Sequence, residues 1–381
     1  MRLTCRRQGL PCDLHVEKSM NVQSLSVTCF RNLGRLQLSP APGVNVLHGL
    51  NGSGKTNLLE ALFTLCLGRS QRRAPDTVLL QHECDVYRLE GKIATSSGPK
   101  SPAVAFQRGG RKKVTIDGAP SKLRELYDHF CAVSVGPEDS EILAGPPAVR
   151  RAFLDMYLSQ FSRLYLSDLI AYQAALAQKN AALKRDMDPS PFDGVLISHG
   201  ARVTCARNSF LSSLAAAAAE YYARISGGER FELRYRPSVP LSNGHAEIGD
   251  AEVAFQVQLD GHSDRERAVQ TALVGPHRDE ILFSVAGYPA RMYGSQGQWR
   301  TAAVALKLAL YQMLKRERGM PPLLLLDEIF AELDEARAMS LIGLFEGFSQ
   351  LFLTTAHKPP AHLRESGAVF RLEDGRIEEQ P

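Results

Sequence analysis

A glycine-rich stretch at residues 49–56 constrains the fold of this chain more than any other feature. It follows the apolar run 44–48 and precedes a helical pattern that begins near Asn57. Strand, glycine loop and helix in this order favour a P-loop, whose backbone N–H groups and helix dipole surround a phosphate. Lys55 would then reach the β- and γ-phosphates of a nucleoside triphosphate, and the Thr56 hydroxyl would hold Mg²⁺. The expected ATP contacts of this stretch are Gly49, Asn51, Gly52, Ser53, Gly54, Lys55, Thr56 and Asn57.

Two carboxylates, Asp327 and Glu328, follow the uniformly apolar run 323–326. Such a run is typical of a parallel strand that is covered on both faces. A carboxylate at the end of a strand beside a P-loop can orient Mg²⁺ through its water shell, which is the role we expect for Asp327. The adjacent Glu328 is placed to polarise the attacking water. Lys55, Asp327 and Glu328 therefore form the predicted catalytic set.

A second candidate anion site lies at residues 295–298, before a long amphipathic pattern at 302–316. Ser295 and Gly297 stand at the N-terminal end of the predicted helix, and no lysine accompanies them. An ordinary helix N-cap at Ser295 is the simpler interpretation. A signature of the ABC type fits better, because a strand with a terminal acidic pair follows one helix later. Residues 226–229 imitate the centre of such a signature, but a β-like pattern follows them, and we interpret them as a turn.

The middle of the chain has helical periodicity from residue 147 to about 223, interrupted at 186–193. The periodicity lacks sustained heptads, so we expect a compact helical lobe and no long coiled coil. Residues 231–236 and 253–259 alternate and are predicted as strands. The expected fold is α/β: an ABC-type P-loop ATPase head with an inserted, mainly helical lobe. Its predicted parts are a dispensable or non-native extension (1–19), the head with the P-loop (20–146), the helical lobe (147–224) and the rest of the head (225–381).

Composition indicates an ordinary soluble globular protein, with 44% hydrophobic and 23% charged residues. The 45 basic and 41 acidic residues give a formal charge of +4, which is too small to argue for nucleic acid by itself. No apolar run approaches the length of a membrane span. The seven cysteines form neither a CxxC pair nor a zinc-like spacing, which indicates reduced thiols. We therefore expect a cytoplasmic location.

Two local basic clusters could still contact DNA. One follows the P-loop helix and could contact a phosphate as well as DNA, and the other surrounds a predicted hairpin turn at residues 108–113. A solvated loop and a charge-protected sheet edge are the respective alternatives. The candidate DNA contacts are Arg69, Arg72, Arg73, Arg111, Lys112 and Lys113.

Over residues 20–381 the chain resembles the RecF family of DNA replication and repair ATPases, relatives of the SMC proteins within the ABC-type superfamily. The motifs that carry the resemblance are residues 30–32, 49–56, 145–155, 275–279, 295–298 and 327–328. It implies signature contacts to ATP from Ser295, Gly297 and Gln298. It also implies a D-loop role for Asp334 and a switch-histidine role for His357, for which a capping or solvent histidine is the alternative. No glutamine stands at the expected Q-loop position, where Gly136, Pro137 and Glu138 follow a predicted strand.

A signature of this type cannot normally reach the P-loop of its own chain. The expected assembly is a head-to-tail homodimer in which each ATP joins Lys55 of one chain to Ser295 of the other. The resemblance implies a weak, DNA-stimulated ATPase that binds double-stranded or gapped DNA and assists RecO and RecR in loading recombinase. Two alternatives are the ATPase subunit of a membrane transporter, which should have a Leu-Ser-Gly-Gly signature and a Q-loop glutamine, and a P-loop kinase or GTPase, which would not need Ser295.

Overall fold

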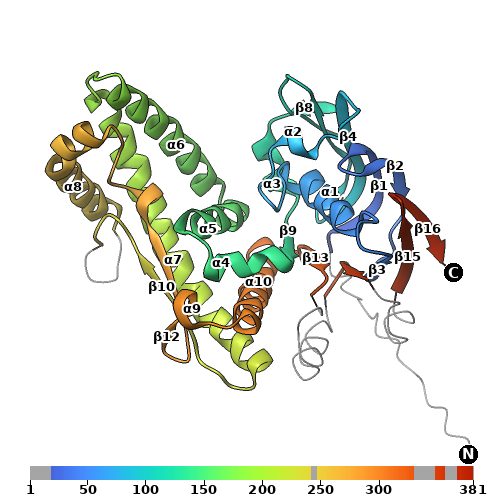
Figure 1. Cartoon of the computed structure of the whole chain (residues 1–381). Helices are drawn as coiled ribbons and strands as arrows, with labels where there is room; N and C mark the ends of the chain where they lie inside the picture. Colours follow the sequence, from blue (N-terminus) through green and yellow to red (C-terminus); the bar gives the residue numbers. More distant parts are fainter. Residues whose placement is uncertain (1–18, 242–246, 330–347, 357–366, 381) are drawn as a thin grey trace, which may run out of the picture.

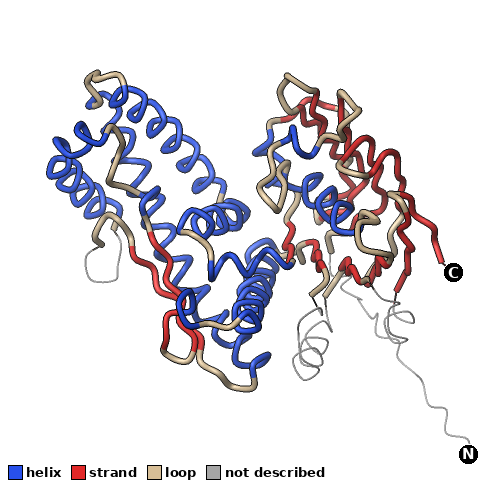
Figure 2. Tube along the Cα trace, viewed as in Figure 1, coloured by secondary structure: helices blue, strands red, loops and turns tan. Residues whose placement is uncertain are grey.

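The chain forms two lobes, one built on β-sheets and one mainly helical (Figures 1 and 2). The computed structural model describes residues 19–241, 247–329, 348–356 and 367–380. The P-loop lobe combines the N-terminal strands with the C-terminal ones, and the helical lobe is inserted between them in the sequence. The extension predicted at 1–19 lies outside the described residues except for Ser19.

A six-stranded sheet with the order β16-β15-β3-β14-β13-β9 carries the P-loop. All its neighbours pair in parallel except β15 and β16. The run 323–326 is fully buried in β13, between β9 and β14, so the prediction of a doubly covered parallel strand is confirmed. The strands are β3 (Val44–His48), β9 (Ala132–Val135), β13 (Leu323–Asp327), β14 (Leu351–Thr355), β15 (Gly367–Glu373) and β16 (Arg376–Gln380).

An antiparallel sheet covers the other side of α1 (Lys55–Leu67), which packs against strands of both sheets. This explains why every residue of α1 from Leu58 to Leu67 is buried, so that this part of the helix has no solvent-exposed face. The hairpin turn predicted at residues 108–113, between β6 and β7, is confirmed. The strands are β1 (Asn21–Phe30), β2 (Leu33–Leu38), β4 (Val86–Thr95), β5 (Gly98–Lys100), β6 (Pro102–Gln107), β7 (Lys113–Ile116) and β8 (Ala119–Ser121), with the short helices α2 (Asp76–Leu79), η1 (Leu123–Glu125) and α3 (Leu126–His129).

The helical lobe is organised around α7 (Asp193–Ser226), which packs against α6, α8, α10 and β10. At 34 residues α7 is the longest helix in the described part of the chain, and the expectation of no long coiled coil is confirmed. None of the described helices has both the length and the apolar composition needed to cross a bilayer. The other elements between β9 and β13 in the sequence are η2 (Pro137–Ser140), α4 (Glu141–Ala144), α5 (Pro147–Phe161), α6 (Arg163–Lys184), η3 (Ser190–Phe192), β10 (Phe231–Arg236), α8 (Ile248–Val269), η4 (Pro276–Arg278), β11 (Glu280–Val285), β12 (Tyr288–Pro289), α9 (Ala290–Tyr293) and α10 (Gln296–Arg318).

The strand predicted at residues 253–259 is wrong, because this segment lies inside α8. Val253 and Val257 alternate with Phe255 and Leu259, which suggested a period of two. In the helix, Phe255 and Leu259 are buried, whereas the valines are 66% and 62% exposed. A spacing of four residues, not two, therefore separates the buried positions.

The domain limits at 146 and 224 stay a prediction. The elements α8 and β10 pack against α7, and β11 pairs with β10. We therefore propose that the helical lobe extends to the end of α10 at Arg318.

Two sequence motifs of unassigned role meet in a buried ion network between α5, α7 and η4. Arg207 is 2% exposed, and its guanidinium lies 2.7 Å from Asp155 Oδ1 and 2.7 Å from Asp279 Oδ2. Nearby, Arg150 pairs with Glu280 at 2.6 Å. A buried arginine that satisfies two carboxylates fixes the relative positions of three segments. In the described structure, residues 150–155 and 275–279 thus hold the helical lobe together.

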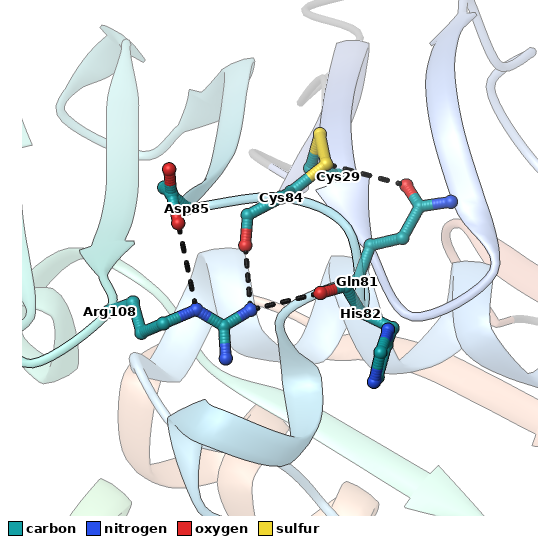
Figure 3. Close-up of a disulfide and its surroundings, with 6 residues drawn as sticks. All are labelled: Cys29, Gln81, His82, Cys84, Asp85 and Arg108. Atoms are coloured by element: carbon teal, nitrogen blue, oxygen red, sulfur yellow. Dashed lines mark hydrogen bonds and ion pairs between the residues drawn. A yellow bond between two sulfur atoms is a disulfide. The ribbon is translucent and has the colours of Figure 1, made fainter.

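The expectation of reduced cysteines is wrong for one pair, because Cys29 and Cys84 form a disulfide (Figure 3). It joins the end of β1 to the loop before β4, where Arg108 donates to the carbonyl oxygen of Cys84 over 2.8 Å. The two cysteines are 55 residues apart in sequence, so no local spacing predicts that they pair. Cys66 and Cys131 remain free and buried.

Candidate nucleotide-binding site

The P-loop has the backbone that its glycines allow. Gly54 caps α1 with φ 108°, and a Cβ there would lie 2.8 Å from the Leu33 side chain. A Cβ on Gly49 would lie 2.2 Å from the Leu372 carbonyl oxygen. The Lys55 ammonium donates to the Gly49 carbonyl over 2.7 Å, which folds the side chain back over the loop. The predicted strand, loop and helix are confirmed.

Thr56 and Asp327 meet although 271 residues separate them. Thr56 Oγ1 donates to Asp327 Oδ1 over 2.9 Å, and Thr354 Oγ1 donates to the same oxygen over 2.7 Å. Burial raises the pKa of Asp327, while the two hydroxyl donors oppose this shift and the Glu328 carboxylate adds to it. A hydroxyl and a carboxylate oxygen at this separation are hard ligands of the kind that Mg²⁺ prefers. Both residues therefore fit the predicted metal role.

Glu328 lies beside the P-loop lysine. Its Oε1 is 3.7 Å from Lys55 Nζ, and its side chain is 31% exposed. Two contacts fix its backbone: its N–H donates to Thr354 Oγ1 over 2.9 Å, and Arg300 donates to its carbonyl oxygen over 2.5 Å. Its φ of 46° is left-handed, a strained value for glutamate. The carboxylate is thus held near the position where a terminal phosphate would lie.

Lys55, Thr56, Asp327 and Glu328 line one cavity of about 350 Å³. Six of the eight predicted P-loop contacts line it, together with the carboxylates of Asp327 and Glu328. The buried Ser53 Oγ has no hydrogen-bond partner within the described structure. The cavity is lined by Asn51, Gly52, Gly54, Lys55, Thr56, Asn57, Arg72, Pro137, Asp327 and Glu328.

Asn32 supports the P-loop and was not predicted as a site residue. Its amide donates to the Gly52 carbonyl over 2.9 Å, and its Oδ1 accepts from Asn57 Nδ2 over 2.8 Å. It belongs to the motif at residues 30–32, in the turn between β1 and β2. Asn32 therefore positions the loop from the antiparallel sheet.

Arg72 also lines the nucleotide cavity. It belongs to the basic run for which a phosphate contact and a DNA contact were both left open. Its Nε lies 2.6 Å from Glu138 Oε1, in the turn η2 that follows β9. Because β9 pairs in parallel with β13, η2 begins at the same sheet edge as Asp327. Glu138 could have been found from the sequence, because it is an acidic residue that follows a strand next to β13, the strand that ends at Asp327.

Ser295 begins α10 in a capping box. Its Oγ accepts from the Gln298 N–H over 3.2 Å, and Gln298 Oε1 accepts from the Ser295 N–H over 3.0 Å. Gln298 Nε2 also donates to Glu229 Oε1 over 2.7 Å. Residues 226–229 form the predicted turn after α7. Through Glu229 this turn contacts the signature candidate at residues 295–298. The Gly297 carbonyl accepts from the Thr301 hydroxyl over 2.8 Å.

The signature candidate and the P-loop lie in different lobes of one chain. Ser295 is exposed at the start of α10, beside α9, while the P-loop precedes α1 in the other lobe (Figure 1). Ser295 does not line the nucleotide cavity. Two other predicted contacts, Asp334 and His357, lie outside the described residues.

The predicted DNA contacts occupy three different places. Arg72 is in the nucleotide cavity, and Arg111 and Lys113 are exposed near the turn before β7. The remaining three residues, Arg69, Arg73 and Lys112, line a separate cleft between the lobes. Their contact with DNA stays a prediction.

Comparison with known proteins extends over nearly the whole chain. Residues 21–372 match the family described as RecF/RecN/SMC N-terminal domain. The DNA replication and repair protein RecF of Halalkalibacterium halodurans is 36% identical over 374 residues, which cover 95% of this chain and 100% of that protein.

Solved structures are similar as well. A structure of the recombination mediator protein RecF with ATP, from the RecFOR pathway, has a TM-score of 0.89 at 31% identity and covers 97% of this chain and 100% of its own. An SMC head domain from Pyrococcus furiosus has a TM-score of 0.54 at 14% identity, with coverage of 95% and 96%, and shares the fold alone. The head fold expected from the sequence is thereby confirmed.

Proposed function

Because the chain belongs to the RecF family, we propose that it is an ATP-binding protein of recombinational DNA repair that forms a head-to-tail homodimer on ATP. The observation that carries this proposal is the division of the site. Lys55, Thr56 and Asp327 line one cavity, whereas Ser295 is exposed on the other lobe of the same chain. A second chain is the natural source of the missing serine.

In this proposal the triphosphate replaces protein carboxylates as partner of two cations. Lys55 is 3.7 Å from Glu328, and Arg72 is 2.6 Å from Glu138. Phosphate oxygens carry more charge than either carboxylate and would draw both cations toward them. Glu328 is then free to polarise a water for hydrolysis, and Mg²⁺ held near Thr56 and Asp327 would neutralise phosphate charge.

Binding of ATP would favour the closed dimer through its higher affinity for that state, and slow hydrolysis would release it. Closure would present a basic surface to the phosphates of double-stranded or gapped DNA, with weak sequence preference and strong salt dependence. Arg111 and Lys113 are our candidates for that surface. A cytoplasmic location, weak DNA-stimulated ATPase activity and assistance to RecO and RecR complete the proposal.

Light scattering with and without ATP tests the dimer. We expect Ser295→Arg to bind ATP but stay monomeric, and Glu328→Gln to remain dimeric because it cannot hydrolyse ATP. Ser96→Arg, at an exposed turn serine between β4 and β5, is the matched control and should behave as the wild type. A monomeric Glu328→Gln protein in saturating ATP would refute the proposal.

A transporter ATPase subunit and a P-loop kinase or GTPase are the alternatives from other functional classes. Specific ATPase activity that rises with protein concentration and with duplex DNA would favour the DNA-repair function over both. Activity that is indifferent to protein concentration and to DNA would contradict it.

A further inference from the structure

A second cavity, of about 630 Å³, lies between the P-loop lobe and the helices α5 and α6. We call it the interlobe cleft. Its two walls differ in chemistry. The wall on the P-loop lobe carries the cations Arg69, Arg73, Lys122 and Arg124, and the wall on α6 carries Leu166, Leu169 and Ile170.

The carboxylates in the cleft neutralise only one of its cations. Asp76 pairs at 2.8 Å with Lys112, which also lines the cleft, and Asp155 pairs with Arg207 at 2.7 Å. Within the part of the chain that the structure describes, Arg73, Lys122 and Arg124 have no ion pair, and all three are exposed. The cleft therefore presents excess positive charge to a ligand.

The apolar wall continues beyond the cleft. Ile170 is 49% exposed although it lies on a helix whose neighbours Leu166 and Leu169 are buried. An adjoining hollow of about 260 Å³ shares Arg124 and Leu166 with the cleft and adds Leu164, which is 79% exposed. The combined groove thus offers an apolar strip beside a row of cations.

We propose that this groove docks an acidic amphipathic segment of a partner protein. Carboxylates of the segment would face Arg73, Lys122 and Arg124, and its apolar side chains would cover Leu164 and Ile170. Duplex DNA matches only one of the two walls, because phosphates beside the apolar strip would lose water without gaining a partner.

The test uses a fluorescein-labelled helical peptide with glutamates on one face and leucines on the other. Fluorescence anisotropy should show saturable binding to the full chain. We expect affinity to fall at least tenfold with Arg73→Glu/Arg124→Glu and about as much with Ile170→Ser, a half-exposed position where folding should be spared. Arg35→Glu/Lys92→Glu reverses two exposed charges away from the cleft and should leave affinity unchanged.

A peptide with lysine in place of glutamate should not bind, and nucleotide affinity should be equal in all variants, which separates this proposal from the proposed function. No saturable peptide binding, or equal binding by all variants, would overturn it. It would also be overturned if Arg73→Glu/Arg124→Glu weakened binding of a duplex oligonucleotide but not of the peptide, since the cleft would then belong to the DNA surface.

Discussion

Lys307 Nζ lies 2.8 Å from Asp139 Oδ1 and so ties α10, the helix that begins at Ser295, to the turn η2 beside the nucleotide cavity. The Lys307 side chain is 4% exposed, and its ammonium also donates to the Ser134 carbonyl over 2.7 Å and to Tyr157 Oη over 3.0 Å. Burial alone would lower the pKa of Lys307, but Asp139 and Tyr157 raise it above its ordinary value of 10.5. The lysine is therefore charged at neutral pH and links the signature candidate to the neighbourhood of the P-loop.

Replacing Lys307 with methionine should destabilise the fold by about 2–4 kcal/mol, because Asp139 keeps its charge after its buried partner is removed. Urea unfolding measures this loss. The double variant Lys307→Met/Asp139→Asn should recover part of it. Because the pKa of Lys307 is raised in the folded state, its contribution to the free energy of unfolding is complete below about pH 10.5. This contribution is lost as pH rises through the folded-state pKa. An unchanged unfolding midpoint for Lys307→Met would show that the pair contributes nothing.

We expect Asp327 to make nucleotide affinity depend on Mg²⁺ and on pH. Burial raises its pKa above 3.8, and metal binding requires the carboxylate. On acidification, the part of the affinity that depends on Mg²⁺ should therefore be lost at a higher pH than for an ordinary aspartate. A fluorescent ATP analogue titrated with Mg²⁺ or with EDTA measures this. Asp327→Asn should bind equally in both conditions, and a variant that retained the full effect of Mg²⁺ would remove Asp327 from the metal site.

The core of the nucleotide site could be predicted because its signals are local. The P-loop and the apolar strand before Asp327 each combine a glycine or acidic motif with a recognisable flank. Asn32, Arg72 and Glu138 could not be assigned in this way. They reach the site through the β1–β2 turn, a loop after α1 and the pairing of β9 with β13, which are tertiary relationships.

The two incorrect predictions, of reduced cysteines and of a strand at residues 253–259, have similar physical origins. The disulfide between Cys29 and Cys84 joins positions 55 residues apart through the fold of the antiparallel sheet. Residues 253–259 alternate over a short window, whereas their helical spacing is visible only when Ala251, Phe255 and Leu259 are considered together. The disulfide and the helical spacing both depend on residues that lie further apart in the sequence than a short local pattern covers.

His277 should make the helical lobe sensitive to acid. Burial lowers its pKa from 6.5 to about 4, and the neutral ring is placed between Tyr172 Oη at 2.5 Å and the Ala272 carbonyl at 3.1 Å. As pH falls below 6.5, the unfolded chain binds a proton at His277 that the folded chain does not bind. The contribution of the neutral ring to stability is therefore complete above pH 6.5 and decreases toward pH 4. The loss is on the order of 3 kcal/mol. Chemical unfolding across this range should show a shallower pH slope for His277→Gln, and an equal slope would contradict the assignment.

The cysteines predict a defined pattern of thiol reactivity. Burial raises the pKa of Cys131 to about 11 and that of Cys66 above its ordinary value, so neither should react with a thiol reagent in the native state. In a Cys5→Ser/Cys12→Ser background, native protein should titrate at most one thiol, Cys205, and mild reduction should add two. Peptide mapping without reductant should recover Cys29 joined to Cys84. Recovery of both as unlinked peptides from protein purified without reductant would contradict the disulfide.

Ser295 has two separable roles, a helix cap and a proposed phosphate contact. Aspartate caps a helix about as well as serine, so Ser295→Asp should keep the melting temperature of the wild type, while Ser295→Ala should cost about 1 kcal/mol. The aspartate carboxylate would repel the triphosphate held by a partner chain, so Ser295→Asp should fail to dimerise with ATP. Thermal unfolding and ATP-dependent light scattering of the two variants separate these effects. If Ser295→Asp dimerised as the wild type does, the serine would only cap α10, and the contact between chains would have to be made elsewhere.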